Sequence, residues 1–217
     1  MNIETVLTPS GALEYDRQYR AWLDAQGPRA LDLDWRMRRL LWRQRVLLRR
    51  FPPDRKRALD FGCMDGIFTL RLQQLGAEAV GYDLSPAAIG QAEKFRGAAS
   101  HPVFTTVPPG PGQFDLVYCN EVLEHIRDDA AFVGELVVFL APGGVLVGTT
   151  PVGKHFWDPD HKREYDRASL ERALSRWGTV RIRRYYRTPL RNLLPFRQEG
   201  AAVFIFEVRP QRLRDAR

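Results

Sequence analysis

Between residues 54 and 150 the chain alternates short apolar runs with stretches of helical apolar spacing. Strands that are joined through helices usually run parallel, and parallel strands buried on both faces read as nearly continuous apolar runs. We expect strands at 57–61, 77–83, 102–107, 114–120 and 144–149, and helices at 66–75, 86–96 and 128–140. The alternation therefore predicts an α/β fold built on a parallel sheet.

The two ends of the chain add elements to this core. The N-terminal part predicts helices at 11–27 and 31–51, and the pair Pro52-Pro53 ends the second helix. The C-terminal part predicts a helix within 166–178 and two further strands, TVRIRRYYR and AAVFIFEV. We expect an N-terminal helical lid or extension over 1–53 and one domain over 54–217, because 217 residues leave no room for a second full domain.

Two glycines, Gly62 and Gly66, mark the turn from the first strand into a helix in the segment ALDFGCMDGIFTL. Glycine allows a tight bend and the close approach of a ligand, and the free amides of a helix start favour an anionic or polar group. Asp83 ends the second strand, from where a carboxylate can accept hydrogen bonds from both hydroxyls of a ribose. These features predict an adenosine-type ligand; the structural alternatives are an ordinary strand-to-helix turn and, for Asp83, a helix cap.

Four segments, DFGCMDG, GYDLS, FDLVYCNEVLEHI and APGGVLVGTTP, follow one another between about residues 57 and 178. Their order and spacing resemble the class I S-adenosylmethionine (SAM)-dependent methyltransferases, most closely the branch that contains the ubiquinone-pathway O-methyltransferases. The resemblance implies a Rossmann-like, seven-stranded, mostly parallel sheet whose last strand is antiparallel. It also implies SAM as the cofactor.

The same resemblance implies roles for individual residues. The methionine part of SAM would be lined by Asp60, Gly62 and Gly66, the ribose held by Asp83, the adenine flanked by Leu84, and the pocket closed by Asn120 and Glu121. The chain departs from the family in two places. Met64 replaces the middle glycine of the loop, and TTVPPGPGQ lacks the acidic residue that many relatives carry after the third strand, which leaves Thr105 and Thr106 as candidates for adenine contacts.

A nicotinamide-binding Rossmann domain is the rival interpretation of these glycines, because it also pairs a glycine turn with an acidic residue about twenty residues later. Such a domain has the pattern G-x-G-x-x-G, whereas this chain has Met64 at the second glycine and no third glycine in register. It also carries the segment EVLEHI, which dehydrogenases do not require. The sequence therefore disfavours an oxidoreductase.

Methyl transfer to a hydroxyl requires that the acceptor be aligned with the methyl group and that its proton be removed. Histidine suits proton removal because its pKa lies near neutral pH. His125 follows the fourth strand and His161 the fifth, so we expect both at the carboxyl edge of the sheet and one of the two as the general base. Glu121, Glu124 and His125 would share one helical face at i, i+3 and i+4, although a cap with surface ion pairs has the same pattern.

The motifs EVLEH and WDPDHKREYDRASL also resemble the small-RNA 3′-terminal 2′-O-methyltransferase family, in which a metal orients the terminal ribose hydroxyls. That resemblance implies metal ligands at Glu121, Glu124, His125 and His161. However, Tyr165 and Asp166 replace a tryptophan and a threonine of that family, and both motifs also occur in metal-free relatives that act on small molecules. We expect a metal-free site and keep the metal site as the alternative.

Charge and composition bear on partners and location. The net charge of +7 is concentrated in residues 29–57 and 179–217, but no nucleic-acid-binding motif accompanies it, so we interpret these flanks as solvated surface. Only two cysteines occur, and we find neither a secretory signal nor a membrane span, which together indicate a cytoplasmic protein. The oligomeric state is not indicated.

The function that we expect is therefore SAM-dependent O-methylation of a small hydroxylated metabolite. One alternative is metal-assisted 2′-O-methylation of RNA, for which the basic flanks would bind the phosphate backbone. Another is a non-catalytic domain that binds SAM or a partner.

Overall fold

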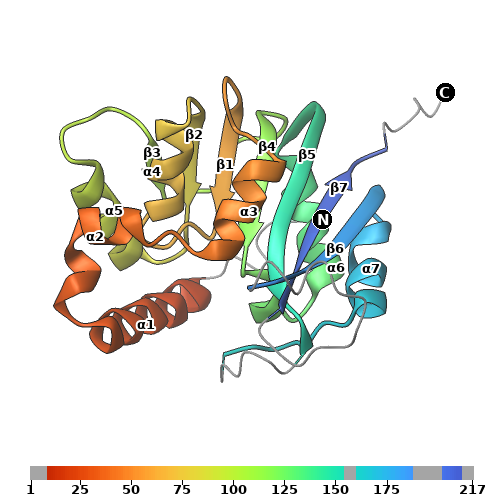
Figure 1. Ribbon diagram of the computed structural model, residues 1–217, viewed down its shortest axis with the longest axis horizontal. Coiled ribbons are helices and arrows are strands. Elements are labelled where there is room, and N and C mark those ends of the chain that lie inside the picture. The colour runs from red at the N-terminus through yellow and green to blue at the C-terminus, as the bar shows by residue number, and fades with distance from the viewer. Residues whose placement is uncertain (1–8, 154–159, 188–201, 212–217) are drawn as a thin grey trace.

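A computed structural model describes residues 9–153, 160–187 and 202–211. Its centre is a seven-stranded sheet with the strand order β3-β2-β1-β4-β5-β7-β6. Strands β1 to β5 pair in parallel, and β7 pairs antiparallel with both β5 and β6. The predicted fold class is therefore confirmed, including the antiparallel last strand (Figure 1).

The elements have the following bounds. The strands are β1 (Arg57–Phe61), β2 (Glu78–Tyr82), β3 (Val103–Thr105), β4 (Phe114–Asn120), β5 (Leu140–Pro151), β6 (Thr179–Tyr186) and β7 (Ala202–Arg209). The helices are α1 (Pro9–Gln26), α2 (Leu33–Arg38), α3 (Trp42–Arg50), α4 (Ile67–Gln74), α5 (Pro86–Arg96), α6 (Asp129–Val138) and α7 (Arg167–Ser175), with short 3₁₀ helices η2 (Pro28–Leu31) and η3 (Leu123–His125).

Both faces of the sheet are covered by helices, which explains why the inner strands β1, β4 and β7 are buried at nearly every position. One apolar cluster joins the sheet to α6 and α7 and includes Leu59, Val117, Leu146, Phe132 and Leu174. The other joins the opposite face to α3 and α4 and includes Ala58, Tyr118, Val147, Leu47 and Leu72.

Strand β5 begins earlier than the predicted 144–149 and ends at Pro151. A register irregularity between Phe114 and Leu116 lets Leu140 pair with Phe114 before the regular pairing resumes at Val145. The helix predicted over 128–140 therefore ends at Val138, because residue 140 already belongs to the sheet.

The prediction of one helix over 31–51 is wrong. The segment forms two separate helices, α2 and α3, and residues 39–41 between them are not helical. Polar contacts stabilise the break: the Asp32 carboxylate caps α2 by accepting from Trp35 N at 2.9 Å, and Arg45 Nε donates to the Leu40 carbonyl at 3.0 Å. The break leaves Leu40 buried and turns α3 onto the sheet, which one straight helix would not achieve.

Helix α1 lies across the edge of the sheet at which β1 and β2 end (Figure 1). The Asp16 carboxylate fixes it there, because its Oδ1 accepts from Ser85 Oγ at 2.9 Å and from Ala87 N at 2.7 Å, at the start of α5. Among the described residues, no helix combines the length and apolar character needed to cross a bilayer.

At the turn into α4, Gly66 is the glycine whose replacement should lower the stability of the fold most. It has φ of 77°, and a Cβ there would lie 2.5 Å from the Phe104 ring and 2.8 Å from Ala92 Cβ. We expect Gly66→Ala to lower the free energy of unfolding by about 2–4 kcal/mol, from left-handed strain and overpacking. Urea-induced unfolding measures this change.

Gly90 provides the matched control, because it lies within α5 and a Cβ there would have no heavy atom within 4 Å. Gly90→Ala should raise the free energy of unfolding by about 0.5–1 kcal/mol through helix propensity. Equal stability of the two variants would contradict the packing described around Gly66.

Candidate functional site

The predicted site residues gather at the edge where the parallel strands end. Phe61 is level with Tyr82 in β2 and with Cys119 in β4, and Cys119 is level with Gly148 in β5. The residues that follow these positions therefore meet at one edge, which is where ligands bind in open α/β sheets.

The bend after β1 has the left-handed backbone that its glycines predict. Gly62 and Gly66 have φ of 76° and 77°, and a Cβ on Gly62 would lie 2.7 Å from Val122 Cγ2. Met64 also has positive φ, at 49°, which is costly for a residue with a side chain. Met64 is 38% exposed, so the residue with this strained backbone lies at the surface.

Asp83 connects the bend to β2. Its Oδ2 accepts from Met64 N at 2.8 Å and its Oδ1 from Ser85 N at 2.9 Å. Burial raises the pKa of Asp83, whereas these two amide hydrogen bonds lower it. Each oxygen keeps a second lone pair, so the carboxylate is held in place and can still accept two hydroxyl groups.

The helix-cap alternative for Asp83 is wrong, because Ser85 occupies the N-cap of α5. Ser85 Oγ accepts from Ala88 N at 3.1 Å. Leu84, between them, is partly buried and packs against the cluster that joins the sheet to α6.

Asp60 lies deeper than the other predicted cofactor residues. It is 2% exposed, and its Oδ2 accepts from Thr69 Oγ1 at 2.7 Å. Burial raises its pKa to about 7, while the bond from Thr69 lowers it. The carboxyl thus links β1 to α4 beneath the bend.

Asn120 and Glu121 lie where β4 ends. Both side-chain polar atoms of Asn120 are buried and lack a hydrogen-bond partner among the described residues, as does Glu121 Oε1. Glu121 has φ of 55°, another left-handed conformation that costs energy in a residue with a side chain. Its Oε2 forms an ion pair with Arg43 Nε of α3, 3.0 Å away, so a residue of the N-terminal extension reaches this edge.

The prediction that Glu121, Glu124 and His125 share a helical face is wrong. Glu121 N still donates to the Thr149 carbonyl at 2.9 Å, so sheet pairing extends to residue 121. The helix that follows, η3, begins only at Leu123 and is three residues long. Glu121 therefore precedes the helix and is held by β5 and α3.

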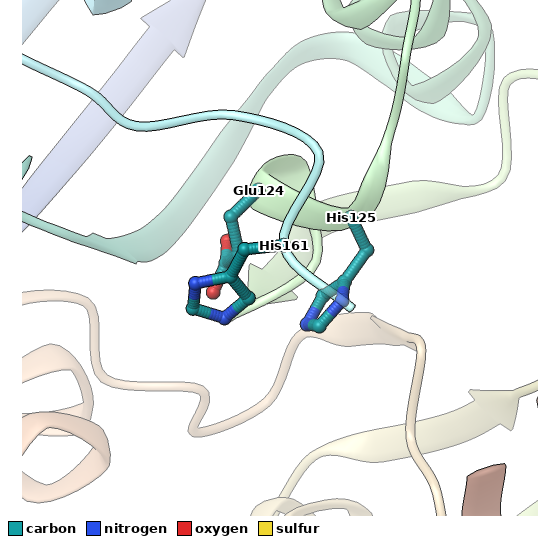
Figure 2. A group of neighbouring side chains, drawn as sticks. All are labelled: Glu124, His125 and His161. Atoms are coloured by element: carbon teal, nitrogen blue, oxygen red, sulfur yellow. The ribbon is translucent and has the colours of Figure 1, made fainter. Parts of the chain in front are cut away.

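Glu124, His125 and His161 nevertheless lie together, as Figure 2 shows. One potential ligand atom from each lies within 4.8 Å of the others, and the two imidazole rings meet edge to face with centroids 4.9 Å apart. His161 comes from the segment after β5, so the structure brings together two histidines that are 36 residues apart in the sequence.

Glu124 is the buried member of this cluster, at 2% exposure. Its Oε2 accepts from Thr150 Oγ1 at 3.0 Å, and its Oε1 is buried without a hydrogen-bond partner in the described part of the chain. Burial raises the pKa of Glu124 well above its ordinary value, and the nearby Glu121 raises it further. A positive charge beside these carboxyl groups would therefore be strongly favoured.

Sequence reasoning missed the polar contacts through which the N-terminal extension holds the site. The Arg36 guanidinium forms a paired hydrogen bond with Asp65, at 2.6 Å and 3.0 Å, and Asp65 is only 2% exposed. Burial raises the pKa of Asp65, and Arg36 counteracts this shift. The sequence signal for this contact was Asp65 itself, because a carboxylate in a buried bend needs a cationic partner.

Helix α1 adds aromatic residues to the same side. Tyr19 is 5% exposed, and its buried hydroxyl has no hydrogen-bond partner among the described residues. Burial raises the pKa of Tyr19, so the hydroxyl stays protonated and available as a donor.

A cleft of about 450 Å³ lies between α6, α7 and the segment before α7. It is lined by Asp129, Ala130, Arg163, Glu164, Tyr165, Ser169, Arg172 and Ala173. The residues of the bend and Asp83 are absent from its lining, so the cleft is separate from the predicted cofactor site.

Comparison with known proteins agrees with the fold. Residues 34–194 match the family model described as "Methyltransferase domain". The ubiquinone biosynthesis O-methyltransferase of Methylococcus capsulatus is 35% identical over 102 residues, which cover 44% of this chain and 43% of that protein. The enzyme of the same name from a Bradyrhizobium strain is 29% identical over 159 residues, covering 67% of this chain and 63% of that protein. The matches to these relatives thus span less than two thirds of their length.

Solved structures share the fold at low sequence identity. A SAM-dependent methyltransferase from Mesorhizobium loti has a TM-score of 0.59 at 19% identity and covers 82% of this chain and 99% of that one. Phosphoethanolamine N-methyltransferase 2 of Haemonchus contortus, solved with SAM, has a TM-score of 0.59 at 18% identity and covers 78% of this chain and 53% of that one. Since the family model covers more than half of the sequence and the neighbours share its sheet, the chain belongs to the methyltransferase domain family.

Proposed function

We propose that this protein transfers a methyl group from SAM to a hydroxyl group of a small metabolite. The observation that carries the proposal is the Asp83 carboxylate, which two backbone amides orient at the edge where Glu124, His125 and His161 also lie. The relatives named for ubiquinone biosynthesis O-methylation support a hydroxyl acceptor, and the similar solved structures named as SAM-dependent or solved with SAM support the donor.

The residues at the edge fit a nucleoside ligand with several polar groups. Gly62 carries no Cβ, Asp83 keeps free lone pairs, and the buried Asn120 amide has hydrogen-bonding capacity that no described residue satisfies. We assign Gly62, Gly66 and Asn120 to the amino-acid part of SAM and Asp83 to its ribose. Asp60 would act from below by fixing the bend, and Leu84 and Glu121 would border the pocket.

SAM supplies an already activated methyl group, so the protein's task is to align the acceptor and remove its proton. Alignment accounts for about 7–11 kcal/mol in favourable intramolecular reactions. His125 and His161 are the candidates for the base, because an imidazole with a pKa near neutrality can take a proton from a hydroxyl group. Glu124, buried beside them, would stabilise the imidazolium that forms.

We further propose that residues 1–53 form a lid over the donor site. Three contacts of the described part support this role: Asp16 with the start of α5, Arg36 with Asp65 and Arg43 with Glu121. Each joins the extension to a segment that follows β1, β2 or β4.

A reducing, cytoplasmic setting fits the two buried free thiols.

A metal-assisted reaction is the second candidate, and the cluster in Figure 2 favours it. Metal–ligand distances near 2.1 Å place the ligand atoms of one ion about 3–4 Å apart. The potential ligand atoms of this cluster lie within 4.8 Å of one another, so they would need to move only slightly closer to bind an ion. Glu124 and Glu121 also supply the negative charge. A divalent cation there would orient a hydroxyl of the acceptor, as the alternative of RNA 2′-O-methylation requires.

Asp83→Asn tests the donor site. Removing the negative charge should weaken binding of SAM or of S-adenosylhomocysteine, its demethylated form, by about 10- to 100-fold, since hydrogen bonds to a charged acceptor contribute about 1.5–3 kcal/mol. Isothermal titration calorimetry measures the affinity. Asp115→Asn, a change at the partly exposed carboxylate paired with Arg57, is the control and should bind as the wild type does. Unchanged affinity in Asp83→Asn would sink the donor site proposed here.

The general base is tested by His125→Ala and His161→Ala, assayed with labelled SAM against a panel of hydroxylated acceptors. Turnover should fall by about 10²- to 10⁴-fold for the histidine that removes the proton, whereas SAM affinity stays within twofold, roughly, of the wild type. His101→Ala alters an exposed histidine before β3 and should leave turnover intact. Wild-type turnover in both test variants would rule out a histidine base.

Metal dependence is tested by elemental analysis of the purified protein and by turnover in excess chelator. If the histidines act as a base without metal, turnover persists in chelator and the protein contains no stoichiometric divalent ion. The second candidate would be favoured instead if turnover is lost in chelator and returns when Mg²⁺, Mn²⁺ or Zn²⁺ is added. In that case Glu124→Gln should abolish the turnover that the metal restores.

A further inference from the structure

His161 owes its position to a segment without helix or strand. Residues 160–166 lie between β5 and α7 in the sequence, and within them only Tyr165 makes an isolated bridge, to Val152. The His161 ring nevertheless meets the His125 ring at 4.9 Å between centroids. Something other than secondary structure must therefore fix this segment.

Backbone contacts tie the two histidine segments directly. Lys162 N and Arg163 N both donate to the carbonyl oxygen of Glu124, at 2.7 Å and 3.1 Å. Those amides follow His161, and that carbonyl precedes His125. The two histidines are thus joined through a single carbonyl group.

The side chain of Arg163 extends this connection from the end of η3 to the start of α6. Its Nε donates to the Ile126 carbonyl at 3.0 Å, its Nη2 donates to the Arg127 carbonyl, and its Nη1 lies 3.5 Å from Asp129 Oδ2. A guanidinium carries several donors in a fixed plane, so one side chain can bind all three acceptors.

Tyr165 closes the arrangement from the other side. Its hydroxyl donates to Asp129 Oδ2 at 2.8 Å, and its carbonyl accepts from Gly153 N at 2.9 Å. Tyr165 and Asp129 are 2% and 8% exposed, so water competes little for these bonds. Tyr165 therefore spans from the end of β5 to the start of α6.

We propose that Asp129, Arg163 and Tyr165 are positioning residues that hold His161 against His125. The inference rests on the proposed function, in which these histidines serve the reaction. None of the three side chains needs to touch the donor or the acceptor. They act by fixing the segment that carries His161, so their loss should displace one imidazole while leaving the donor site at Gly62 and Asp83 unchanged.

The test is the nuclear Overhauser effect between the two imidazole rings in protein labelled with ¹³C-histidine. The chain has four histidines, so single His→Gln variants assign the resonances. Tyr165→Phe removes only the hydroxyl group, and we expect it to weaken the His125–His161 cross-peak by about threefold or more as the segment loosens. Tyr118→Phe is the matched control, because the buried Tyr118 hydroxyl also donates one short bond, to the Phe51 carbonyl at 2.7 Å, on the opposite face of the sheet.

An unchanged cross-peak in folded Tyr165→Phe, or an equal loss in Tyr118→Phe, would overturn the proposal. If Tyr165→Phe does not fold, Arg163→Lys makes the same comparison at a side chain that is 38% exposed, and it should also weaken the cross-peak. Once an acceptor is identified, kcat of Tyr165→Phe should fall by about 10- to 100-fold while the KM for SAM is unchanged.

Failure of the proposed function gives a different result. Wild-type protein would then not bind S-adenosylhomocysteine in calorimetry, whereas the cross-peak comparison would still decide whether these residues position His161.

Discussion

The candidate site depends on the hydrogen bonds that join Asp83 to the bend after β1. Met64 N can donate to Asp83 because residue 64 adopts a left-handed conformation, which costs energy in a residue with a side chain. The second bond, from Ser85 N, fixes the carboxylate at the start of α5. Two strand ends are thereby connected through one charged group, and the parallel register brings β4 and β5 to the same level.

The rest of the edge follows from the need to compensate buried charge. Asp65 within the bend, Glu121 at the end of β4 and Asp16 in α1 each have a polar or charged partner from a distant segment. Arginines of the N-terminal extension supply two of these partners. The extension therefore contributes to the electrostatics of the site, and part of the basic charge near residues 29–57 is paired with acids of the methyltransferase domain.

Sequence reasoning predicted the features that local patterns determine. Apolar runs located the strands, and the spacing from Gly62 to Asp83 located the edge, because both depend on residues near one another in the chain. The predictions failed where contacts between residues far apart in the sequence determine the structure. Glu121 was expected on a helix, but its amide donates to the Thr149 carbonyl of β5. The EVLEH pattern does not show that sheet pairing with β5 competes with helix formation at this residue. Likewise, an arginine in a basic run has the same sequence signal whether it is solvated or, like Arg36, bound to a buried carboxylate.

The central claim is that the bend and Asp83 bind the donor at the carboxyl edge. Amide chemical-shift mapping of ¹⁵N-labelled protein during titration with S-adenosylhomocysteine tests it most directly. The account predicts that the largest shifts fall on residues 62–66, 83–85 and 120–121. Shifts confined to the cleft around Asp129 and Arg172, or no saturable shifts at all, would contradict it.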